Sequence, residues 1–250
     1  MMKSIVRWIG IASLAVASIS PASAAIVNGG FESDSPIGWD FFGSVQILPV
    51  GQDFGVPPEG IRHALLQSHD NVAYSVPDLE NFLQLQLTPL SGLGFSPLSS
   101  GSAIAQNISA TAGDVLSFRW NFLTNEDFGP TPPPDVDFAF FSLVSESGPV
   151  LISSVLDPNL ASSLSPYAQE TGYQYYEYTI QATGTYRLGF GVIDVDGVVS
   201  PSALLLDDVQ LTSGSTVIPE PATASVLWLG ATLTSAVMWR RRRRSATPAA

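Results

Sequence analysis

The 250-residue sequence predicts an all-β protein, an antiparallel β-sandwich. Several stretches alternate apolar and polar residues with a period of two, the pattern of a half-buried strand. Turn-forming residues separate these stretches, as in Ala112-Gly113 and Asp196-Gly197. Segments with a helical period of 3.6 are almost absent. Ten or so short strands without helices are typical of two packed sheets.

The clearest alternation lies in 114–122, 175–180 and 184–194. In the first of these, the apolar residues at even positions, from Leu116 to Phe122, share one face of the strand. Further strands are predicted at Val45–Leu48, His63–Gln67, Ala103–Ile108, Phe138–Val144, Val150–Ser153 and Leu204–Leu211. Pro77–Leu90 is predicted to be a short helical or irregular stretch.

The N-terminus has the three parts of a secretory signal peptide. Lys3 and Arg7 form the charged region, Trp8–Ile19 is apolar, and a small-residue cleavage pattern ends at Ala24. We therefore expect residues 1–24 to be removed and the β-sandwich to occupy residues 25–212. The alternative is an uncleaved N-terminal membrane anchor.

The C-terminus combines an apolar stretch with a basic cluster. Ala222–Trp239 is uncharged, and as a helix it is about 27 Å long, close to the thickness of the hydrocarbon core. Five arginines follow and predict a cytoplasmic side under the positive-inside rule. They are Arg240, Arg241, Arg242, Arg243 and Arg244. We expect one transmembrane helix at 222–239, a linker at 213–218 before it and a cytoplasmic end at 245–250.

Pro219, Glu220 and Pro221, the apolar span and the arginine cluster together resemble the PEP-CTERM sorting signal of Gram-negative bacteria, here over residues 219–244. The resemblance implies an exosortase-type sorting protease as a partner and removal of the tail. It also implies a membrane-held intermediate in the inner membrane, a product at the cell surface or in the matrix, and a host that makes exopolysaccharide. The alternative is a permanent membrane anchor.

Charge excludes one class of partner. Between the two ends lie only three arginines against 21 acidic residues, so the body repels phosphate backbones and nucleic acid is a poor partner. Divalent cations suit such a surface better, although acidity also keeps an exported protein soluble. The chain has no cysteine, which excludes a disulfide scaffold and a thiolate metal site.

The body also carries a spaced pattern from its first to its last predicted strand. N-G-G-F-E begins at Asn28, Gly38-Trp39 follows, and Asp207-Asp208-Val209 lies near the end. With Gln106-x-Ile108 between them, this pattern is similar to the galactose-binding-like jelly rolls, which include several carbohydrate-binding modules. The resemblance implies a jelly-roll sandwich in which the first and last strands are neighbours.

That resemblance implies a structural Ca²⁺ bound by Glu32 and by Asp207 or Asp208. Neighbouring residues of a strand point to opposite faces, so one of the two aspartates is expected to face the ion and the other the solvent. Backbone carbonyls complete the six to eight oxygens that Ca²⁺ takes. The alternative is that these acids are solvated strand ends. A second acidic group consists of Asn125-Glu126-Asp127 with Asp135 and Asp137, and of Asp194-x-Asp196-Gly197 later in the chain. It is interpreted as acidic turns, because Asp194–Gly197 lacks the third ligand position and the distal glutamate of an EF-hand loop.

A sugar ring packs its C–H face on an exposed aromatic ring, while acids and amides bind its hydroxyls. In 175–180, Tyr176 shares a face with Tyr178 and Ile180, and Tyr175 lies on the opposite face, so one of Tyr175 and Tyr176 is expected to face outward. Trp39 and Trp120 are expected in the core. The ligand, if any, stays unidentified. The candidate aromatic residues are Trp39, Phe41, Phe54, Tyr167, Tyr173 and Tyr175.

Catalytic motifs are not found in the sequence. The two histidines, His63 and His69, lack an evident third ligand and are interpreted as surface or loop residues. We therefore expect an exported, non-enzymatic protein of the surface or matrix, associated with exopolysaccharide or biofilm. The alternatives are a calcium-stabilised carbohydrate-binding module with a specific glycan ligand, and a secreted glycan-active enzyme with paired carboxylates.

Overall fold

A computed structural model describes residues 26–33, 35, 37–69, 72–86, 89–126, 136–155, 160–197 and 200–214. The chain divides into two units at Ser213, and all described residues except Gly214 belong to the first. The predicted signal peptide, the Pro-Glu-Pro motif, the transmembrane helix and the arginine cluster lie outside the described residues. Within the described part of the chain, no helix is long and apolar enough to cross a membrane.

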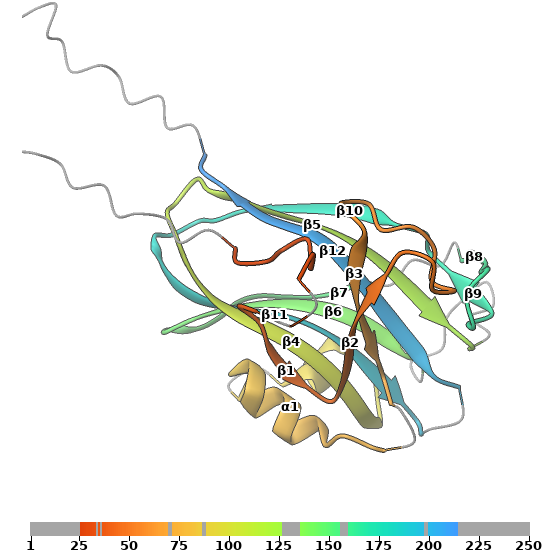
Figure 1. Ribbon diagram of the computed structural model, residues 1–250. Helices are drawn as coiled ribbons and strands as arrows, with labels where there is room; N and C mark the ends of the chain where they lie inside the picture. The colour runs from red at the N-terminus through yellow and green to blue at the C-terminus, as the bar shows by residue number, and fades with distance from the viewer. Residues whose placement is uncertain are drawn as a thin grey trace, which may run out of the picture. The chain divides into compact units, whose positions relative to one another are not determined.

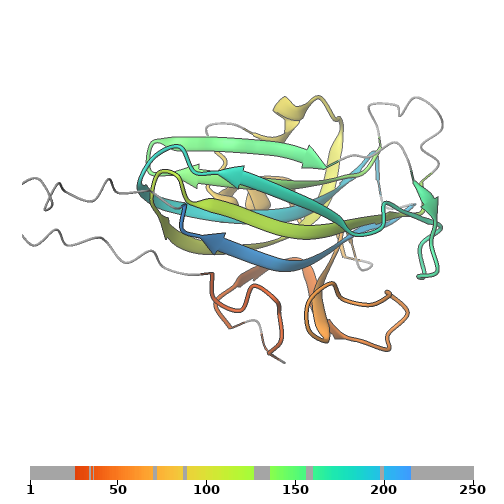
Figure 2. The ribbon, with the colours of Figure 1, turned by 90° about the horizontal axis from the view of Figure 1, so that it is seen from above.

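Two antiparallel sheets are packed face to face, as predicted (Figures 1 and 2). The five-stranded sheet has the order β1 (Asp40–Phe42), β4 (Leu98–Ala110), β11 (Gly184–Val195), β6 (Phe138–Ser145) and β7 (Gly148–Val155). The seven-stranded sheet has the order β2 (Ser44–Pro49), β3 (Arg62–Gln67), β12 (Ser202–Thr212), β5 (Val115–Thr124), β9 (Gln169–Glu170) and β8 (Ala161–Ser162). Its seventh strand, β10 (Gln174–Thr179), also pairs with β5.

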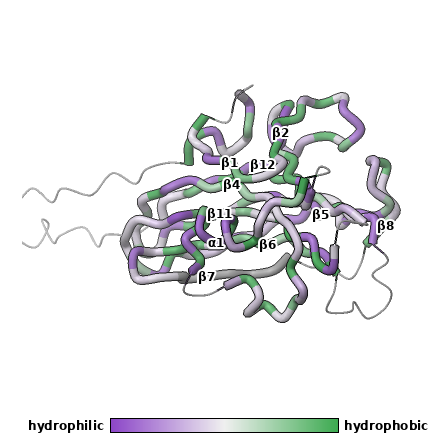
Figure 3. The backbone as a smooth tube through the Cα atoms, turned by 90° about the horizontal axis from the view of Figure 1, so that it is seen from below, coloured by the Kyte–Doolittle hydropathy of each residue, from purple (hydrophilic) through white to green (hydrophobic). Residues whose placement is uncertain are grey.

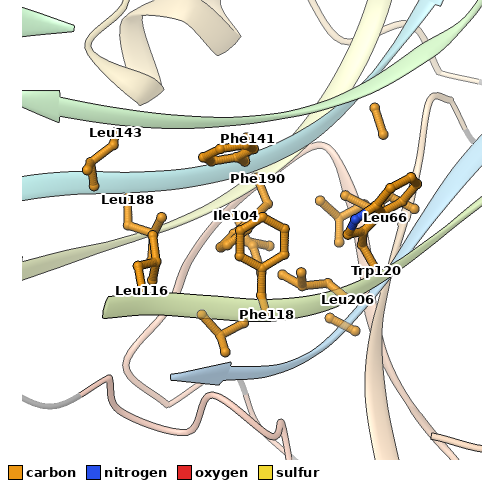
Figure 4. Packing of buried hydrophobic residues seen from close by; sticks show 14 of the residues in the cluster. Leu66, Ile104, Leu116, Phe118, Trp120, Phe141, Leu143, Leu188, Phe190 and Leu206 are labelled. Carbon is orange, nitrogen blue, oxygen red and sulfur yellow. The ribbon is translucent and has the colours of Figure 1, made fainter. Parts of the chain in front are cut away.

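The core lies between the two sheets and is built from the alternating residues of β5 and β11. The Phe118 ring meets Phe190 at 4.8 Å and Phe141 at 5.1 Å between centroids, both edge-to-face, the geometry that aromatic rings favour (Figure 4). Leu116 and Trp120 extend this row along β5. The predicted inward face of this strand is therefore confirmed.

One helix covers the side of the five-stranded sheet that points away from the core. α1 (Val76–Leu83) begins after Ser75, whose side chain accepts a hydrogen bond from the Asp78 amide. It buries Leu79 and Leu83 in a second apolar cluster over β4, β6 and β11. A 3₁₀ turn, η1 (Leu90–Leu93), follows it. Away from these clusters, hydrophilic and hydrophobic segments are interspersed over the described trace (Figure 3).

Candidate functional site

The face of the seven-stranded sheet that points away from the core carries most of the predicted ligand-binding aromatic residues. We call it the outer face. Part of it is covered by the segments that connect β2 to β3 and β8 to β10, which place Phe54, Tyr167 and Tyr173 over a third apolar cluster. Leu65 and Leu205 belong to that cluster. The part formed by β10, β5 and the end of β12 is more exposed.

The covered part holds a polar network. Tyr173 Oη lies 2.7 Å from His63 Nδ1, and the two ring centroids are 6.2 Å apart. Asn121 Nδ2 donates to Glu170 Oε2 at 2.7 Å, and Thr171 Oγ1 donates to Asn121 Oδ1 at 3.1 Å. These side chains come from β3, β5, β9 and the segment before β10, so the network joins the sheet to its cover.

Burial sets the protonation of this network. It lowers the pKa of His63 to about 4, so the imidazole is neutral at pH 7. Burial, together with the charges of Asp207 and Glu170, raises the pKa of the Tyr173 hydroxyl. The interpretation of His63 as a surface residue is therefore wrong. The residue is buried because its strand lies beneath the covering segment, which the spacing of two histidines could not reveal.

The exposed part is centred on Tyr175, which is 53% exposed. The Arg119 guanidinium lies 5.4 Å from the centre of its ring, and Tyr175 Oη donates to Glu177 Oε2 at 3.2 Å. Arg119 Nε also contacts Asp208 Oδ2 at 3.3 Å, and Gln210 Nε2 donates to Asp208 Oδ1. We call these five residues the Tyr175 platform. It offers one flat aromatic surface with carboxylate, guanidinium and amide groups beside it.

The prediction that one of Tyr175 and Tyr176 faces outward is confirmed, and Tyr175 is the outward one. Its neighbour Tyr176 turns inward and stacks on Phe118, with ring centroids 5.2 Å apart. The remaining candidate aromatic residues divide between the core and the outer face. Trp39 is buried in the core with its Nε1 donating to Asn28 O, and Phe41 packs against the same core. These two are not on the outer face, whereas Phe54, Tyr167, Tyr173 and Tyr175 are.

The expected neighbourhood of the first and last strands holds only for the N-terminal motif, which is not a strand. The first strand, β1, pairs with β4 in the five-stranded sheet, whereas β12 lies in the seven-stranded sheet. The Val209 amide donates to the Gly29 carbonyl at 3.0 Å, which ties the N-terminal turn to β12. A Cβ at Gly29 would lie 1.9 Å from the Val209 carbonyl oxygen, so only glycine fits there. Phe31, which follows in the motif, is buried, and its ring packs against that of Trp39 with the centroids 5.5 Å apart.

The structure brings Glu32 and Asp207 to one turn but not Asp208. Glu32 Oε1 accepts from the Ile61 and Arg62 amides, both at 2.9 Å. Asp207 Oδ2 accepts from the Glu59 amide at 2.9 Å. Asp207 is fully buried at this turn, whereas Asp208 turns toward the platform. Strand alternation predicts opposite faces for the two aspartates, but both lie on the outer face. Asp207 pairs in register with Arg119, whose side chain contacts Asp208, and a β-bulge with Asp208 at a φ of 54° interrupts the alternation.

Glu59 is the carboxylate that sequence reasoning missed at this turn. A Cβ on Gly30 would lie 2.1 Å from Glu59 Oε2, and a Cβ on Gly60 would lie 2.2 Å from the carboxylate of Glu32. Burial raises the pKa of Asp207 to about 7, with smaller contributions from Glu59 and Asp208 that act in the same direction. An oxygen-only donor set that repels itself fits a hard cation. Within the described residues, however, no three His, Cys, Asp or Glu side chains are already arranged around a metal position.

No family model matches the chain, and no curated protein matches it. Solved structures are similar to it in part. A structure of TmCBM61 in complex with β-1,4-galactotriose is 13% identical over 76% of this chain and 99% of that chain, with a TM-score of 0.39. The K1 cleaved adhesin domain of Lys-gingipain from Porphyromonas gingivalis W83 is 10% identical over 77% and 98%, with a TM-score of 0.41. The enzymatically active domain of bacteriophage CBA120 tailspike protein 4 is 12% identical over 75% of this chain and 21% of that chain, with a TM-score of 0.36. Sequence identities and TM-scores this low say nothing of what this chain binds.

Proposed function

We propose that the protein is an exported, non-enzymatic β-sandwich of a bacterial surface or matrix that binds polysaccharide through the Tyr175 platform. The exposed Tyr175 ring carries this proposal. A sugar ring stacks on such a surface, while carboxylate and amide groups bind its hydroxyls. Glu177 on β10 and Gln210 on β12 lie on the two strands that flank β5, at the same position along the sheet, since both pair in register with Ser117.

Export and sorting rest on the two ends of the sequence. The signal-peptide pattern ending at Ala24 and the PEP-CTERM-like segment at 219–244 support secretion, a membrane-held intermediate and processing by an exosortase. Delivery to a surface rich in exopolysaccharide supplies the ligand class that the platform suits. Replacing Pro219, Glu220 and Pro221 by alanine is expected to leave an unprocessed, membrane-retained product on a blot. Normal processing of that variant would remove the sorting proposal and leave the platform untouched.

A structural Ca²⁺ belongs to this proposal. Glu32, Glu59 and Asp207 would hold it, and it would supply positive charge that fixes the N-terminal turn on β12. Glu32→Gln is expected to reduce the rise in melting temperature that calcium produces. Asp208→Ala is the matched control, because Asp208 turns toward Arg119 rather than toward the turn. If calcium stabilises the Glu32 variant as strongly as the wild type, the ion is not at this turn.

Binding is tested by co-sedimentation of the purified protein with the host exopolysaccharide. The wild type is expected to bind saturably, and Tyr175→Ala to lose most of this binding because the stacking surface is gone. Tyr175→Phe keeps the ring and is expected to retain most of it. Leu164→Ala is the control for an exposed apolar side chain elsewhere, since Leu164 is 98% exposed. Equal binding by the wild type and Tyr175→Ala would place any glycan site elsewhere.

The enzyme alternative is separated by one further assay. Glu177 contacts Tyr175, and Asp208 contacts Arg119, which lies over the Tyr175 ring. Glycosidases use a pair of carboxylates for catalysis. Our proposal predicts no release of reducing ends when the protein is incubated with the polysaccharide that it binds. Release that disappears in Glu177→Gln would show a glycan-active enzyme instead.

A further inference from the structure

A second group of acids lies at the end of the sandwich where β5 and β11 end and β6 and β12 begin. Asp137 directly precedes β6, Asp194 is the penultimate residue of β11, and Glu126 follows β5. Asp137 Oδ1 accepts from the Val195 amide at 2.8 Å, and its own amide donates to Glu126 Oε2 at 2.8 Å. The Ser202 hydroxyl of β12 lies beside Asp137, so the group connects both sheets.

Asp137 and Asp194 are both 0% exposed, so the interpretation of these acids as surface turns is wrong. Their carboxyl groups are close enough for Asp137 to affect the pKa of Asp194. Asp194 Oδ1, Asp194 Oδ2 and Asp137 Oδ2 are buried oxygens without a hydrogen-bond partner in the structure. Buried polar atoms are nearly always paired, so three such oxygens at one point indicate that a proton or a cation is missing there.

Within the described body, none of the groups that shift the pKa of Asp137 or Asp194 is cationic. Its cationic residues are Arg62, Arg119 and Arg187. Arg119 pairs with Asp208 on the outer face, and Arg187 Nη1 pairs with Asp40 at 2.6 Å. Arg62 opens β3 beside Glu32, whose carboxylate accepts from its backbone amide. Either shared protons or a bound cation must therefore compensate the two buried aspartates.

We propose that Asp137 and Asp194 bind a calcium ion that joins the two sheets at this end of the sandwich. Both ligands are hard oxygen donors, which favours Ca²⁺ over softer metals. With two carboxylates rather than three as side-chain ligands, hydroxyl, backbone carbonyl and water oxygens complete the coordination. Burial raises the pKa of Asp137 to about 8 and that of Asp194 to about 6, as expected for carboxyls that lack a positive neighbour.

This position differs from the turn that holds Glu32 and Asp207. Ser202 and Asp207 are five residues apart on β12, which corresponds to about 16 Å along an extended strand. The proposal therefore does not rest on the proposed function, and the two calcium positions can be removed separately. An ion bound between the sheets is expected to stabilise the folded protein, because it would offset a repulsion between carboxylates that exists only in the folded state.

The test uses calcium titration of the full-length protein, by calorimetry and by melting temperature, with EDTA as the metal-free state. Asp194→Asn keeps the shape of the side chain and removes its charge. It is expected to lose the calcium affinity of this position by at least about tenfold, because one of two charged ligands is gone. In EDTA it is expected to melt at a higher temperature than the wild type, because the buried repulsion is gone. Asp137→Asn is expected to behave in the same way, whereas Glu32→Gln keeps the response of this position.

Two results would overturn the proposal. One is an equal calcium response in the wild type and both asparagine variants. The other is a wild type that binds no calcium at this position and is stabilised in EDTA when the pH falls from about 8 to about 5, which would show that the pair shares protons instead. Glycan binding is measured separately, so the loss of the Tyr175 platform and the loss of this ion are distinguishable.

Discussion

Gly29 lies where the N-terminal turn meets β12, and its missing side chain sets how closely the two approach. A Cβ at this position would overlap the Val209 carbonyl oxygen. The two backbones would have to move apart, which would break the hydrogen bond from the Val209 amide to the Gly29 carbonyl. Gly29→Ala is expected to destabilise the protein by about 1–3 kcal/mol in urea unfolding. Gly92→Ala is the control, because nothing lies within 4 Å of its Cβ position. A Gly29 variant as stable as the Gly92 variant would contradict this contact.

His63 makes the stability depend on pH. Its pKa is about 4 in the folded protein and about 6.5 when unfolded, so below pH 6.5 the unfolded chain takes up a proton that the folded protein does not. The contribution of neutral His63 to the free energy of unfolding is fully present above pH 6.5. It is lost as the pH falls toward 4, by at most about 1.4 kcal/mol per pH unit. Urea unfolding of the wild type and His63→Gln at successive pH values measures this.

The difference between these two proteins isolates His63, because the buried aspartates with raised pKa values are present in both. The groups that face the imidazole are the Tyr173 hydroxyl and, beyond it, Asp207. The difference in unfolding free energy is expected to shrink as the pH falls below 6.5. A difference that is constant from about pH 7 to about pH 4.5 would mean that His63 is protonated without cost in the folded protein.

At the scale of single residues, alternation was a reliable guide within regular strands. It placed Tyr175 and Tyr176 on opposite faces, because side-chain direction in a regular strand follows from sequence parity alone. It failed at Asp207 and Asp208, which both lie on the outer face because a β-bulge with Asp208 at positive φ interrupts β12. The burial of His63 and Asp194 could not be predicted, because it depends on loops and strand ends that come from distant parts of the chain. Glu59 was missed for the same reason, since no pattern relates it to Gly30.

At the scale of elements, α1 owes its position to packing rather than to its own length. Eight residues form a marginal helix in isolation, so Leu79 and Leu83 must hold it on the five-stranded sheet. Leu79→Ala is expected to lower the unfolding free energy by about 2–5 kcal/mol. Asn81→Ala, on the exposed side of the same helix, is expected to change it by no more than about 0.5 kcal/mol. Equal effects of the two changes would mean that the helix is not held by its buried side.

All nine strands predicted from alternation or apolar runs are present, with bounds shifted by a few residues. The strands that were not predicted are β1, β8 and β9, which have three, two and two residues. Such short strands show no periodicity and exist only because a neighbouring strand accepts their hydrogen bonds. The stretch predicted as helical or irregular, Pro77–Leu90, is helical only in its first half, since α1 begins at Val76 with a proline in its first turn and ends at Leu83.

At the scale of the whole molecule, the shared feature of all three candidate sites is excess negative charge. The turn at Glu32, the acids at Asp137 and the platform carboxylates all lie in a body with three arginines, at least two of which are committed to ion pairs. Folding brings these acids closer together than they are in the unfolded chain. The sequence predicts this property, since charge counts need no structure, but not where the acids converge.

This excess of acids predicts how the melting temperature responds to salt. In EDTA, raising sodium chloride from about 0.02 to about 0.5 M shortens the Debye length from roughly 20 Å to roughly 4 Å and screens the repulsion between carboxylates. The melting temperature is expected to rise by a few degrees, as measured by calorimetry, and potassium chloride is expected to act equally because the effect is not ion-specific. Screening also weakens the attractions of Arg119 to Asp208 and of Arg187 to Asp40. A melting temperature that falls with salt would therefore mean that these two pairs outweigh the repulsion among all the other acids.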